Sequence, residues 1–457
     1  MKLNPAIFRA YDIRGIVSDA LTPEVVETIG RAFGSEAASQ NQQTVVIGRD
    51  GRLSSPELAR ALAAGLQSAG RDVIDVGLVP TPVLYFATYL LNTGTGIMIT
   101  GSHNPPEYNG LKMMLAGNTL FGENIQVLRR RIEEGELISG NGSYNQRDVI
   151  DDYVQRIVSD IKLERPINFA VDCGNGAAAA VAGRLFSALG LKPVELFCEV
   201  DGHFPNHHPD PSKEKNLVDI RKVIEQQKLE LGLAFDGDGD RLGVVDGAGT
   251  IIWPDRQMIL YARDILQRNP GVPVVFDVKC SSHLRHAIEE AGGQPVMSQT
   301  GHSFIKLTLK KTGALLGGEM SGHIFFKERW YGFDDGLYAA ARLLEILSQS
   351  DQPPEQVFAA LPNSVNTPEL NIGFAEGEHY QFMETLKTRA AFPGAEITGI
   401  DGIRADFKDG WGLVRASNTT PALVLRFEAD SDAALNRIQD LFREQMLDID
   451  ASLQLPF

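Results

Sequence analysis

The same order of segments occurs three times along this chain. In each copy an apolar run rich in β-branched residues leads into a helix-like run, a glycine and a second apolar run. Apolar strands that alternate with amphipathic helices are typical of strand–helix–strand units whose sheet is covered by helices. Three copies predict three similar α/β domains. Their first strands are expected at 44–50, 167–172 and 272–277, and the helices that follow are expected to end near residues 69, 189 and 291.

The chain beyond residue 362 has a different pattern. Pro353-Pro354 and Pro362-Asn363 are typical of linkers, and Asp409-Gly410 stands between two strand-like runs. An Asp-Gly pair in this position is a good signal for a hairpin. This part is therefore predicted to be a small α+β domain with an antiparallel sheet. Its strands are expected at 403–407, 411–415 and 422–427.

The predicted fold class is α/β, with three similar α/β domains of mixed sheets covered by helices and a smaller C-terminal α+β domain around a central cleft. At 457 residues the chain is too long for one ordinary core. Ligand sites in α/β sheets lie at the carboxyl ends of strands, so one polar loop per domain is expected to line the cleft. The domains are expected at 1–148, 149–250, 251–362 and 363–457.

Charge and composition exclude several classes of partner. The net charge of −16 disfavours binding to nucleic acid or to an anionic membrane, although a locally positive cleft could still bind a small anion. The three cysteines show no CxxC spacing, which favours free thiols in a reducing compartment. The N-terminus carries no apolar leader, and no apolar run approaches the ~18 residues of a membrane span. A cytoplasmic protein is expected.

An acidic loop follows the apolar run 231–235. Its alternating carboxylates can converge on one point, and all-oxygen ligation favours Mg²⁺ or Ca²⁺. Arg241 beside them suggests an anionic ligand such as phosphate. An EF-hand fits poorly, because its sixth and twelfth positions would hold Arg241 and Gly247. A solvated acidic turn without metal is the remaining alternative. The three carboxylates belong to Asp236, Asp238 and Asp240.

A serine lies on a restrained turn at 100–105, with the sequence Thr-Gly-Ser-His-Asn-Pro. Ser102 is a candidate nucleophile once a neighbour removes its proton or neutralises an incoming phosphoryl group. An ordinary polar turn is the alternative, and no Gly-x-Ser-x-Gly elbow is present. His103 is adjacent, but neighbours on a turn often point apart. Lys112 is either a surface lysine, a phosphate contact or a base near Ser102.

Two further loops carry polar side chains. In 318–323, three alternating residues lie on one side of an extended loop and could contact sugar hydroxyls, with the histidine transferring protons or binding phosphate. A zinc site is the alternative, but it lacks cysteines and an HExxH spacing. The segment 415–421 combines a guanidinium with hydroxyls and an amide, which suits a phosphate cradle, or else a simple Ser/Thr turn. The alternating residues are Glu319, Ser321 and His323.

Together these loops resemble those of the α-D-phosphohexomutase family, in the bacterial phosphomannomutase/phosphoglucomutase branch. The motifs span nearly the whole chain in family order, one per domain. The phosphoglucosamine mutase branch differs, because its loops resemble Gly-Glu-Gln-Ser-Gly-His and Ser-Gly-Thr-Glu-Pro where this chain has Met320 and 417–421. The matching segments are 11–15, 100–105, 236–241, 318–323 and 415–421.

The resemblance implies reversible transfer of a phosphoryl group between the 1- and 6-positions of mannose and glucose phosphates. Ser102 would carry the phosphoryl group, and the three aspartates of the acidic loop would bind Mg²⁺ together with a phosphoserine oxygen. Hexose 1,6-bisphosphate would be both intermediate and activator. Arg241 and Lys112 would neutralise the transferring group, and Lys112 and His323 are the candidates for acid–base work.

The resemblance also implies a substrate-binding set. Glu319, Ser321 and His323 would face the sugar. The non-reacting phosphate would be held by Arg415, Ser417, Asn418 and Thr419. Further positions lining the cleft would be Tyr11, Arg14, Lys279 and His302. A monomer is expected. The alternatives are a phosphoserine-based sugar phosphatase, which would release inorganic phosphate, and a sugar-phosphate or metal-binding protein without turnover.

Overall fold

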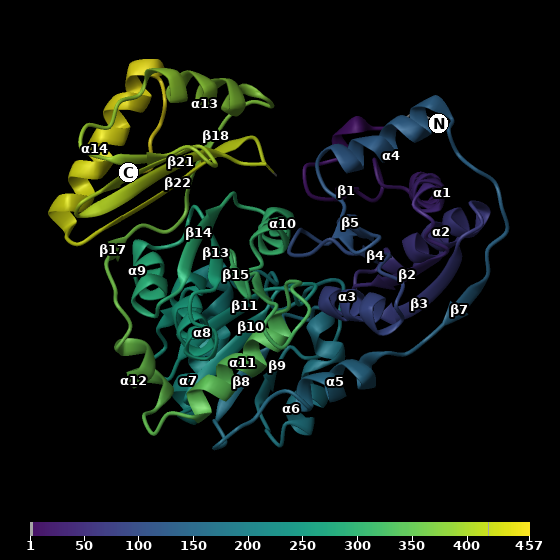
Figure 1. Ribbon diagram of the computed structural model, residues 1–457, viewed down its shortest axis with the longest axis horizontal. Coiled ribbons are helices and arrows are strands. Elements are labelled where there is room, and N and C mark those ends of the chain that lie inside the picture. The colour runs from purple at the N-terminus through teal and green to yellow at the C-terminus, as the bar shows by residue number, and fades with distance from the viewer. Residues whose placement is uncertain (1–2, 419) are drawn as a thin grey trace.

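The computed structural model describes residues 3–418 and 420–457 of the chain, and Figure 1 shows their arrangement. Four sheets follow one another along the sequence, with seven, five, four and six strands. The N-terminal part (purple and blue) and the C-terminal part (yellow) flank the two middle parts (teal and green) in this view. The four sheets and their helices match the predicted fold class.

The first three sheets share one strand order, which confirms the repeat seen in the sequence. In each, the central strand pairs in parallel with the second and third strands of its unit, and a fourth strand adds antiparallel to the third. The orders are β3-β2-β4-β5, β9-β8-β10-β11 and β14-β13-β15-β16. The connection from the third to the fourth strand is the loop that carries the conspicuous polar residues in every unit.

The first unit is the largest. Thr22 caps its first long helix by accepting a hydrogen bond from the Val25 N–H, and that helix packs against the next one. Its strands are β1 (Ile13–Ile16), β2 (Thr44–Arg49), β3 (Asp72–Leu78), β4 (Gly96–Ile99), β5 (Tyr108–Leu115), β6 (Asn118–Thr119) and β7 (Tyr144–Gln146). Its helices are η1 (Pro5–Ile7), α1 (Pro23–Ser39), α2 (Ser55–Ser68), α3 (Thr81–Leu90) and α4 (Glu123–Glu134).

The second unit departs from the prediction in one place. The continuous helix expected to end near 189 is instead a short 3₁₀ turn followed by a two-turn helix, because Ala177 donates its N–H to the Gly237 carbonyl at 2.9 Å and is held against the acidic loop. The strands are β8 (Phe169–Asp172), β9 (Val194–Leu196), β10 (Leu231–Phe235), β11 (Leu242–Asp246) and β12 (Ile251–Ile252). The helices are α5 (Ile150–Val158), η2 (Ala177–Ala180), α6 (Ala182–Ala188), η3 (Glu214–Leu217) and α7 (Val218–Gln227).

The third unit has the smallest sheet and long covering helices. Asp335 caps one of these, α11, by accepting the Tyr338 N–H at 2.9 Å. Its strands are β13 (Pro273–Asp277), β14 (Gln294–Ser298), β15 (Leu316–Gly318) and β16 (Ile324–Phe326). Its helices are α8 (Pro254–Arg268), α9 (Ser282–Glu290), α10 (His302–Thr312), α11 (Gly336–Ser348) and α12 (Pro354–Ala359).

The last unit pairs its strands antiparallel throughout, as predicted. Its hairpin turn lies one residue earlier than expected, at 408–409, because Gly410 already pairs with Phe407. A side chain at Gly410 would lie 2.4 Å from the Glu428 carbonyl, so the glycine serves the close approach of the next strand. The elements are β17 (Val365–Asn366), β18 (Leu370–Gly373), α13 (Glu378–Arg389), β19 (Glu396–Thr398), β20 (Ile403–Phe407), β21 (Gly410–Ala416), β22 (Ala422–Ala429) and α14 (Asp432–Ile449).

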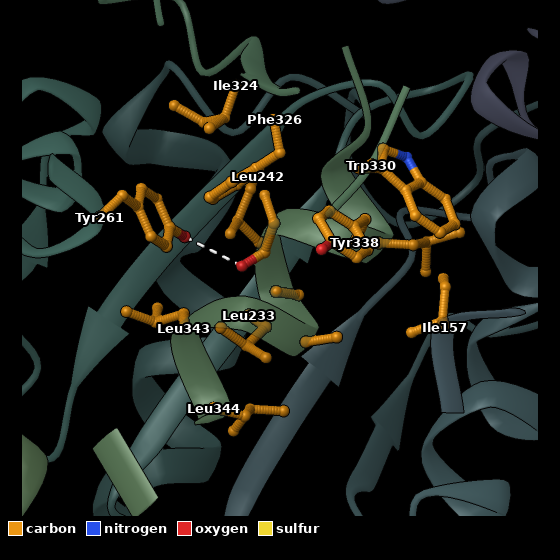
Figure 2. Packing of buried hydrophobic residues seen from close by; sticks show 14 of the residues in the cluster. Ile157, Leu233, Leu242, Tyr261, Ile324, Phe326, Trp330, Tyr338, Leu343 and Leu344 are labelled. Carbon is orange, nitrogen blue, oxygen red and sulfur yellow. Dashed lines mark hydrogen bonds between the residues drawn. The ribbon is translucent and has the colours of Figure 1, made fainter. Parts of the chain in front are cut away.

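One large apolar cluster joins the second and third units and extends into the first. Figure 2 shows Leu233 and Leu242, from adjacent strands of the second sheet, in the same apolar cluster as Tyr261 and Phe326 of the third unit. The Tyr261 hydroxyl donates to the Ala339 carbonyl at 3.0 Å, which satisfies the only polar atom of that side chain. The last unit has a separate core of its own. Within the described residues, no helix combines the length and apolar character that a membrane crossing requires.

Candidate active site

The polar loops of the first three units meet at one place. Each loop leaves the third strand of its unit, so equivalent positions in the three sheets supply it. The Ser102 hydroxyl donates to a carboxylate oxygen of Asp236 at 3.3 Å. The Arg241 guanidinium donates from Nε to Nε2 of His323 at 3.0 Å. These two contacts link the serine loop to the acidic loop and the acidic loop to the third loop.

Ser102 is held in an unusual backbone conformation. Its φ angle is 51°, in the left-handed region that residues other than glycine rarely adopt. Its N–H donates to the Thr100 hydroxyl at 2.8 Å, and only 2% of the residue is exposed. Such a conformation in a buried polar loop is typical of functional sites.

His103 lies against the serine hydroxyl, although the sequence suggested that the two side chains point apart. The distance from Ser102 Oγ to His103 Nδ1 is 3.1 Å. Burial lowers the pKa of His103 well below its usual value, and the nearby Arg241 and Arg14 cations lower it further. A neutral imidazole at this distance can accept the hydroxyl proton. The motif contained this histidine, but only the left-handed turn at Ser102 brings the two side chains together.

The three carboxylates of the acidic loop are fully buried and close together. Asp236, Asp238 and Asp240 each have 0% exposure, and a ligand oxygen from each lies within 4.8 Å of the others. Burial raises the pKa of Asp236 well above its usual range, and the neighbouring charges of Asp240 and Asp238 raise it further. Within 3–418 and 420–457, one oxygen each of Asp238 and Asp240 accepts no hydrogen bond, although that of Asp240 lies 3.4 Å from Nδ1 of His323. Buried oxygens without partners that crowd in this way fit an oxygen-liganded divalent cation.

Lys112 projects from β5 into the acidic loop. Its ammonium donates to Asp238 at 2.7 Å and to Asp240 at 2.5 Å, and only 4% of the residue is exposed. Burial disfavours its charge, but the two carboxylates dominate and raise the pKa of Lys112 well above its usual value. Lys112 therefore keeps its proton, which favours the role of a fixed cation over that of a base.

His323 lies between Asp240, which the sequence analysis singled out, and Asp334, which it did not. Its Nδ1 is 3.1 Å from a carboxylate oxygen of Asp334 and 3.4 Å from one of Asp240. Asp334 also accepts a hydrogen bond from Lys306 at 3.1 Å. Despite complete burial, Lys306 and the histidine hold the pKa of Asp334 well below its usual range. Because Nε2 of His323 accepts from Arg241, its proton belongs on Nδ1, facing the carboxylates.

Asp334 and Lys306 were not predicted from the sequence. Asp334 stands beside Asp335, the N-cap of α11, and a pair of aspartates before a helix is typical of capping. Lys306 lies on α10, where a lysine suggests a solvated face. Only the tertiary arrangement brings them to the histidine.

The remaining residues of the third loop are arranged around His302 and Glu319. The Glu319 carboxylate accepts the Gly301 N–H, and burial raises the pKa of Glu319. His302 stacks on His323 with ring centroids 5.6 Å apart, and burial, followed by the charge of Lys306, lowers its pKa well below the usual value. Ser321 is partly exposed beside them.

Tyr11 connects the first unit to the third and fourth units. Its hydroxyl donates to the Thr300 carbonyl at 2.9 Å and accepts a hydrogen bond from the Asn418 amide. Burial raises the pKa of Tyr11, so the hydroxyl stays protonated at neutral pH. The first, third and fourth units therefore contact one another through one side chain.

The loop of the fourth unit holds its guanidinium in place. Arg415 donates from Nε to Asp401 at 2.8 Å, and the same carboxylate oxygen accepts the Thr300 N–H at 3.0 Å. Ser417 accepts the Thr420 N–H at 3.2 Å, which closes a turn. Thr419, the fourth residue predicted here, lies outside the described residues.

Two other predicted cations are held at the edges of the site. Lys279 donates to Glu369 of the fourth unit at 3.0 Å. Arg14 donates to the Asn104 side chain at 2.9 Å and also pairs with Asp12. Arg14 is therefore tied to the serine loop, and Lys279 to the fourth unit.

Comparison with known proteins identifies the family. Family models described as phosphoglucomutase/phosphomannomutase match four stretches: α/β/α domain I at 5–138, domain II at 151–249, domain III at 253–365, and the C-terminal domain at 369–445. A Pseudomonas aeruginosa protein named phosphomannomutase/phosphoglucomutase is 54% identical over 455 residues, which cover 100% of this chain and 98% of that protein. The chain belongs to the phosphoglucomutase/phosphomannomutase family.

Other members of the phosphoglucomutase/phosphomannomutase family agree in sequence and in fold. A Neisseria gonorrhoeae protein named phosphoglucomutase is 56% identical over 441 residues, which cover 96% of each chain. The crystal structure of a phosphoglucomutase/phosphomannomutase family protein from Burkholderia thailandensis superposes with a TM-score of 0.95 at 52% identity, with both chains covered completely. The resemblance seen in the loops is thus confirmed for the whole chain.

Proposed function

We propose that this chain interconverts the 1- and 6-phosphates of mannose and of glucose through a phosphorylated Ser102. The observation that carries the proposal is the contact of the Ser102 hydroxyl with Asp236, at 3.3 Å, inside a cluster of three buried carboxylates beside Lys112. A serine placed this way can exchange a phosphoryl group when a divalent cation, held by the carboxylates, and Lys112 offset the charge of that group. The names of the related P. aeruginosa and N. gonorrhoeae proteins support both sugars.

The transfer has two halves. In the first, the bond between phosphorus and Ser102 Oγ breaks as a bond forms to the free hydroxyl of the hexose monophosphate, giving a hexose 1,6-bisphosphate. In the second, the bisphosphate presents its other phosphoryl group, and the bond from that phosphorus to the sugar oxygen breaks as a bond to Ser102 Oγ forms. The proton removed from the sugar hydroxyl in the first half must be returned to the sugar oxygen in the second. A mutase therefore needs groups that serve both directions.

The neighbouring side chains provide these functions. Lys112 and Arg241 are fixed cations that offset the charge on the transferring group. His323, with Nδ1 facing Asp334 and Asp240, is the candidate for exchanging the sugar proton. His103 is the candidate that accepts and returns the hydroxyl proton of an unphosphorylated Ser102. Glu319, Ser321 and His302 would contact the sugar hydroxyls.

Mg²⁺ is the cofactor proposed for the acidic loop. Asp236, Asp238 and Asp240 would hold it with an oxygen of phosphorylated Ser102, and it would supply a positive charge that stabilises the transferring phosphoryl group. The unpartnered oxygens of Asp238 and Asp240 support this assignment. Hexose 1,6-bisphosphate is proposed as the activator that restores phosphate to Ser102.

The non-reacting phosphate is proposed to bind the fourth unit. Arg415, Ser417, Asn418 and Thr419 would hold it, with Tyr11, Arg14 and Lys279 around the entrance. One cradle must accept the sugar in two orientations, which favours a separate unit that closes over the ligand and excludes water. The unit limits proposed are 1–148, 149–250, 251–362 and 363–457. A monomer in the cytoplasm without nucleic-acid partners is also proposed, in keeping with the charge of −16.

The test is a paired turnover assay followed by ³¹P NMR. Protein with Mg²⁺ and a trace of glucose 1,6-bisphosphate receives mannose 1-phosphate or glucose 1-phosphate. We expect the 6-phosphate of each sugar without free phosphate, and we expect turnover by Ser102→Ala to fall by at least about 10⁴-fold with an unchanged circular dichroism spectrum. Release of inorganic phosphate, or near-native turnover by Ser102→Ala, would contradict the scheme.

A further inference from the structure

We propose that Arg52 is a positioning residue for phosphoryl transfer, because it holds the loop of Ser102 in its reactive conformation from behind. The inference rests on the proposed function, in which Ser102 is the phosphoryl carrier. Arg52 belongs to the turn after β2 and stood in none of the motifs that the sequence made conspicuous. Its side chain is fully buried.

One guanidinium serves four backbone carbonyls of the serine loop. Nη2 donates to the Ser102 carbonyl at 2.8 Å and to that of Asn104 at 2.5 Å. Nη1 donates to the carbonyls of Pro105 at 2.5 Å and Tyr108 at 2.9 Å. The inward-pointing carbonyls of a loop do not receive the hydrogen bonds that a helix or sheet would supply. Here the buried guanidinium, which has several N–H donors in one plane, supplies them instead. The loop is thereby fixed over its whole length.

The charge of Arg52 is balanced by a residue that also grips the loop. Asp50 accepts from Arg52 Nε at 3.2 Å through the same oxygen that accepts the Gly101 N–H at 3.0 Å. The pair therefore holds the loop at its entry through an N–H and along its length through carbonyls. A side chain at Gly101 would lie 2.4 Å from the guanidinium carbon, so the backbone approaches the cation as closely as it can.

The bond to the Ser102 carbonyl has the most direct link to the reaction. Ser102 has a strained φ of 51°, and a hydrogen bond to its own carbonyl helps to fix that orientation. A side chain at Gly237 of the acidic loop would lie 2.3 Å from this same carbonyl oxygen. Arg52 and the acidic loop therefore hold the Ser102 carbonyl from different sides, and its place determines how far the hydroxyl lies from Asp236.

The second unit braces the guanidinium as well. The ring of Phe204 lies with its centroid 5.3 Å from the Arg52 guanidinium carbon. A side chain at Gly202 would lie 2.7 Å from the Gly51 carbonyl, so the two turns are in close contact. Arg52 thus fixes the serine loop relative to the unit that carries the metal ligands, as well as within its own unit.

The test separates transfer to Ser102 from substrate binding. Dephosphorylated native protein, Arg52→Lys and Arg52→Met are mixed with glucose 1,6-bisphosphate and Mg²⁺, and phosphorylation of Ser102 is followed by intact mass. A displacement of about 1 Å in a reacting group lowers rates about 10²-fold. We therefore expect the rate of phosphorylation and kcat to fall about 10²-fold in Arg52→Met, with KM for glucose 1-phosphate within about threefold of native. Arg52→Lys, which keeps the charge but few of the donors, should recover only part of the rate.

A structural role alone would give a different result. Arg342 is another fully buried arginine, on α11, whose ion pairs lie outside the site, and Arg342→Met is the matched control. It should lower the melting temperature without changing the phosphorylation rate per folded molecule. If Arg52→Met does not fold, Gly101→Ala tests the same contact by displacing the guanidinium, with the same expected loss of rate.

The possible outcomes are distinct. Folded Arg52 and Gly101 variants that phosphorylate Ser102 at the native rate would overturn the inference and leave the proposed function intact. A loss that matches the unfolded fraction, or a rise in KM with unchanged kcat, would also overturn it. A native protein that never accepts phosphate on Ser102 would overturn the proposed function, and the inference with it.

Discussion

At the scale of single residues, the site is a set of charges that oppose and offset one another within a few ångströms. Three buried carboxylates repel each other, and the ammonium of Lys112 bonds to two of them. Lys112 therefore takes one oxygen each of Asp238 and Asp240 and leaves the other oxygen of each carboxylate for a divalent cation. The lysine and the metal ion are expected to compete for the same negative charge.

Replacing Lys112 with methionine tests this competition. Removing the ammonium frees carboxylate oxygens, so half-saturation should occur at a lower Mg²⁺ concentration than in the native protein. The transferring phosphoryl group loses a fixed cation, so kcat should fall about 10²- to 10³-fold, as is typical when one stabilising group is removed. Steady-state turnover across a Mg²⁺ titration measures both quantities. Weaker Mg²⁺ binding in the variant would show that Lys112 supports the metal site instead of competing with it.

The residues that complete motifs singled out lie close together in the structure, and their roles stay predictions. Ser102, the three aspartates and His323 are brought together because equivalent loops of three repeated sheets carry them. Asp334 and Arg52 were missed for different reasons. Asp334 resembles a capping residue beside Asp335, whereas Arg52 resembles an ordinary arginine in a turn. The burial of Asp334 and the bonds of Arg52 to carbonyls far along the chain produce no pattern in the local sequence, so the sequence could not predict them.

At the scale of secondary-structure elements, strand order follows from the repeat, whereas details of the connections do not. The helix expected up to residue 189 is interrupted because Ala177 is bonded to Gly237 of the acidic loop. The hairpin turn lies at 408–409 because Gly410 is needed where β22 approaches. In both places the local sequence favours one structure, a helix up to residue 189 or a turn at 409–410, and a contact with a distant segment changes it.

The carboxyl end of β8 gives a pH-dependent contribution to stability. His207 Nε2 lies 2.9 Å from Asp172, at the end of that strand. Burial opposes the charge of His207, but the bond to Asp172 and its negative charge outweigh this and raise the pKa of His207. A histidine with a raised folded-state pKa binds its proton more tightly in the folded protein. Its contribution to the free energy of unfolding is therefore complete below the unfolded-state pKa of about 6.5, and it is lost as pH rises through the folded-state pKa.

The expected result is a fall in unfolding free energy between about pH 6 and pH 8, by less than about 1 kcal/mol because the ring is partly exposed. Urea unfolding at several pH values, followed through a probe in the second unit, measures it. His207→Gln serves as the comparison and should show a flatter dependence over that range. An equal slope in both proteins would assign the pH dependence to other groups.

At the scale of the whole molecule, the fourth unit stands apart from the other three. The apolar cluster of the first three units is continuous, while the fourth packs around its own core. Its links to the rest combine polar bonds with one small apolar cluster: Arg404 donates to the carbonyls of Val278 and Cys280 at 2.7 Å each, and Asn418 bonds to Tyr11. Trp411 and Leu413 pack against Val278 of the third unit. This apolar contact is small beside the cores of the units, so separating the fourth unit would expose little apolar area, which suits the proposed opening for substrate.

Tyr11→Phe removes the hydroxyl that links the first unit to Thr300 and Asn418. Both of its bonds are lost, so the fourth unit should spend more time away from the first. We expect a larger radius of gyration by small-angle X-ray scattering without ligand, and a rise of about tenfold in KM for glucose 1-phosphate, the effect of about 1.4 kcal/mol. Tyr144→Phe, which loses an exposed bond to Asp75 within the first unit, is the control and should change neither. An unchanged radius with an altered KM would mean that Tyr11 acts on the ligand alone.

The contact between Arg52 and Gly101 also constrains how such a chain can change over generations. The guanidinium occupies the volume that any side chain at position 101 would need. A substitution at 101 displaces the cation, and a substitution at 52 leaves the carbonyls of the serine loop without donors. A single substitution at either position is therefore expected to slow phosphoryl transfer, so the two positions are expected to change together or not at all. Two residues far apart in the sequence would then be under one common constraint.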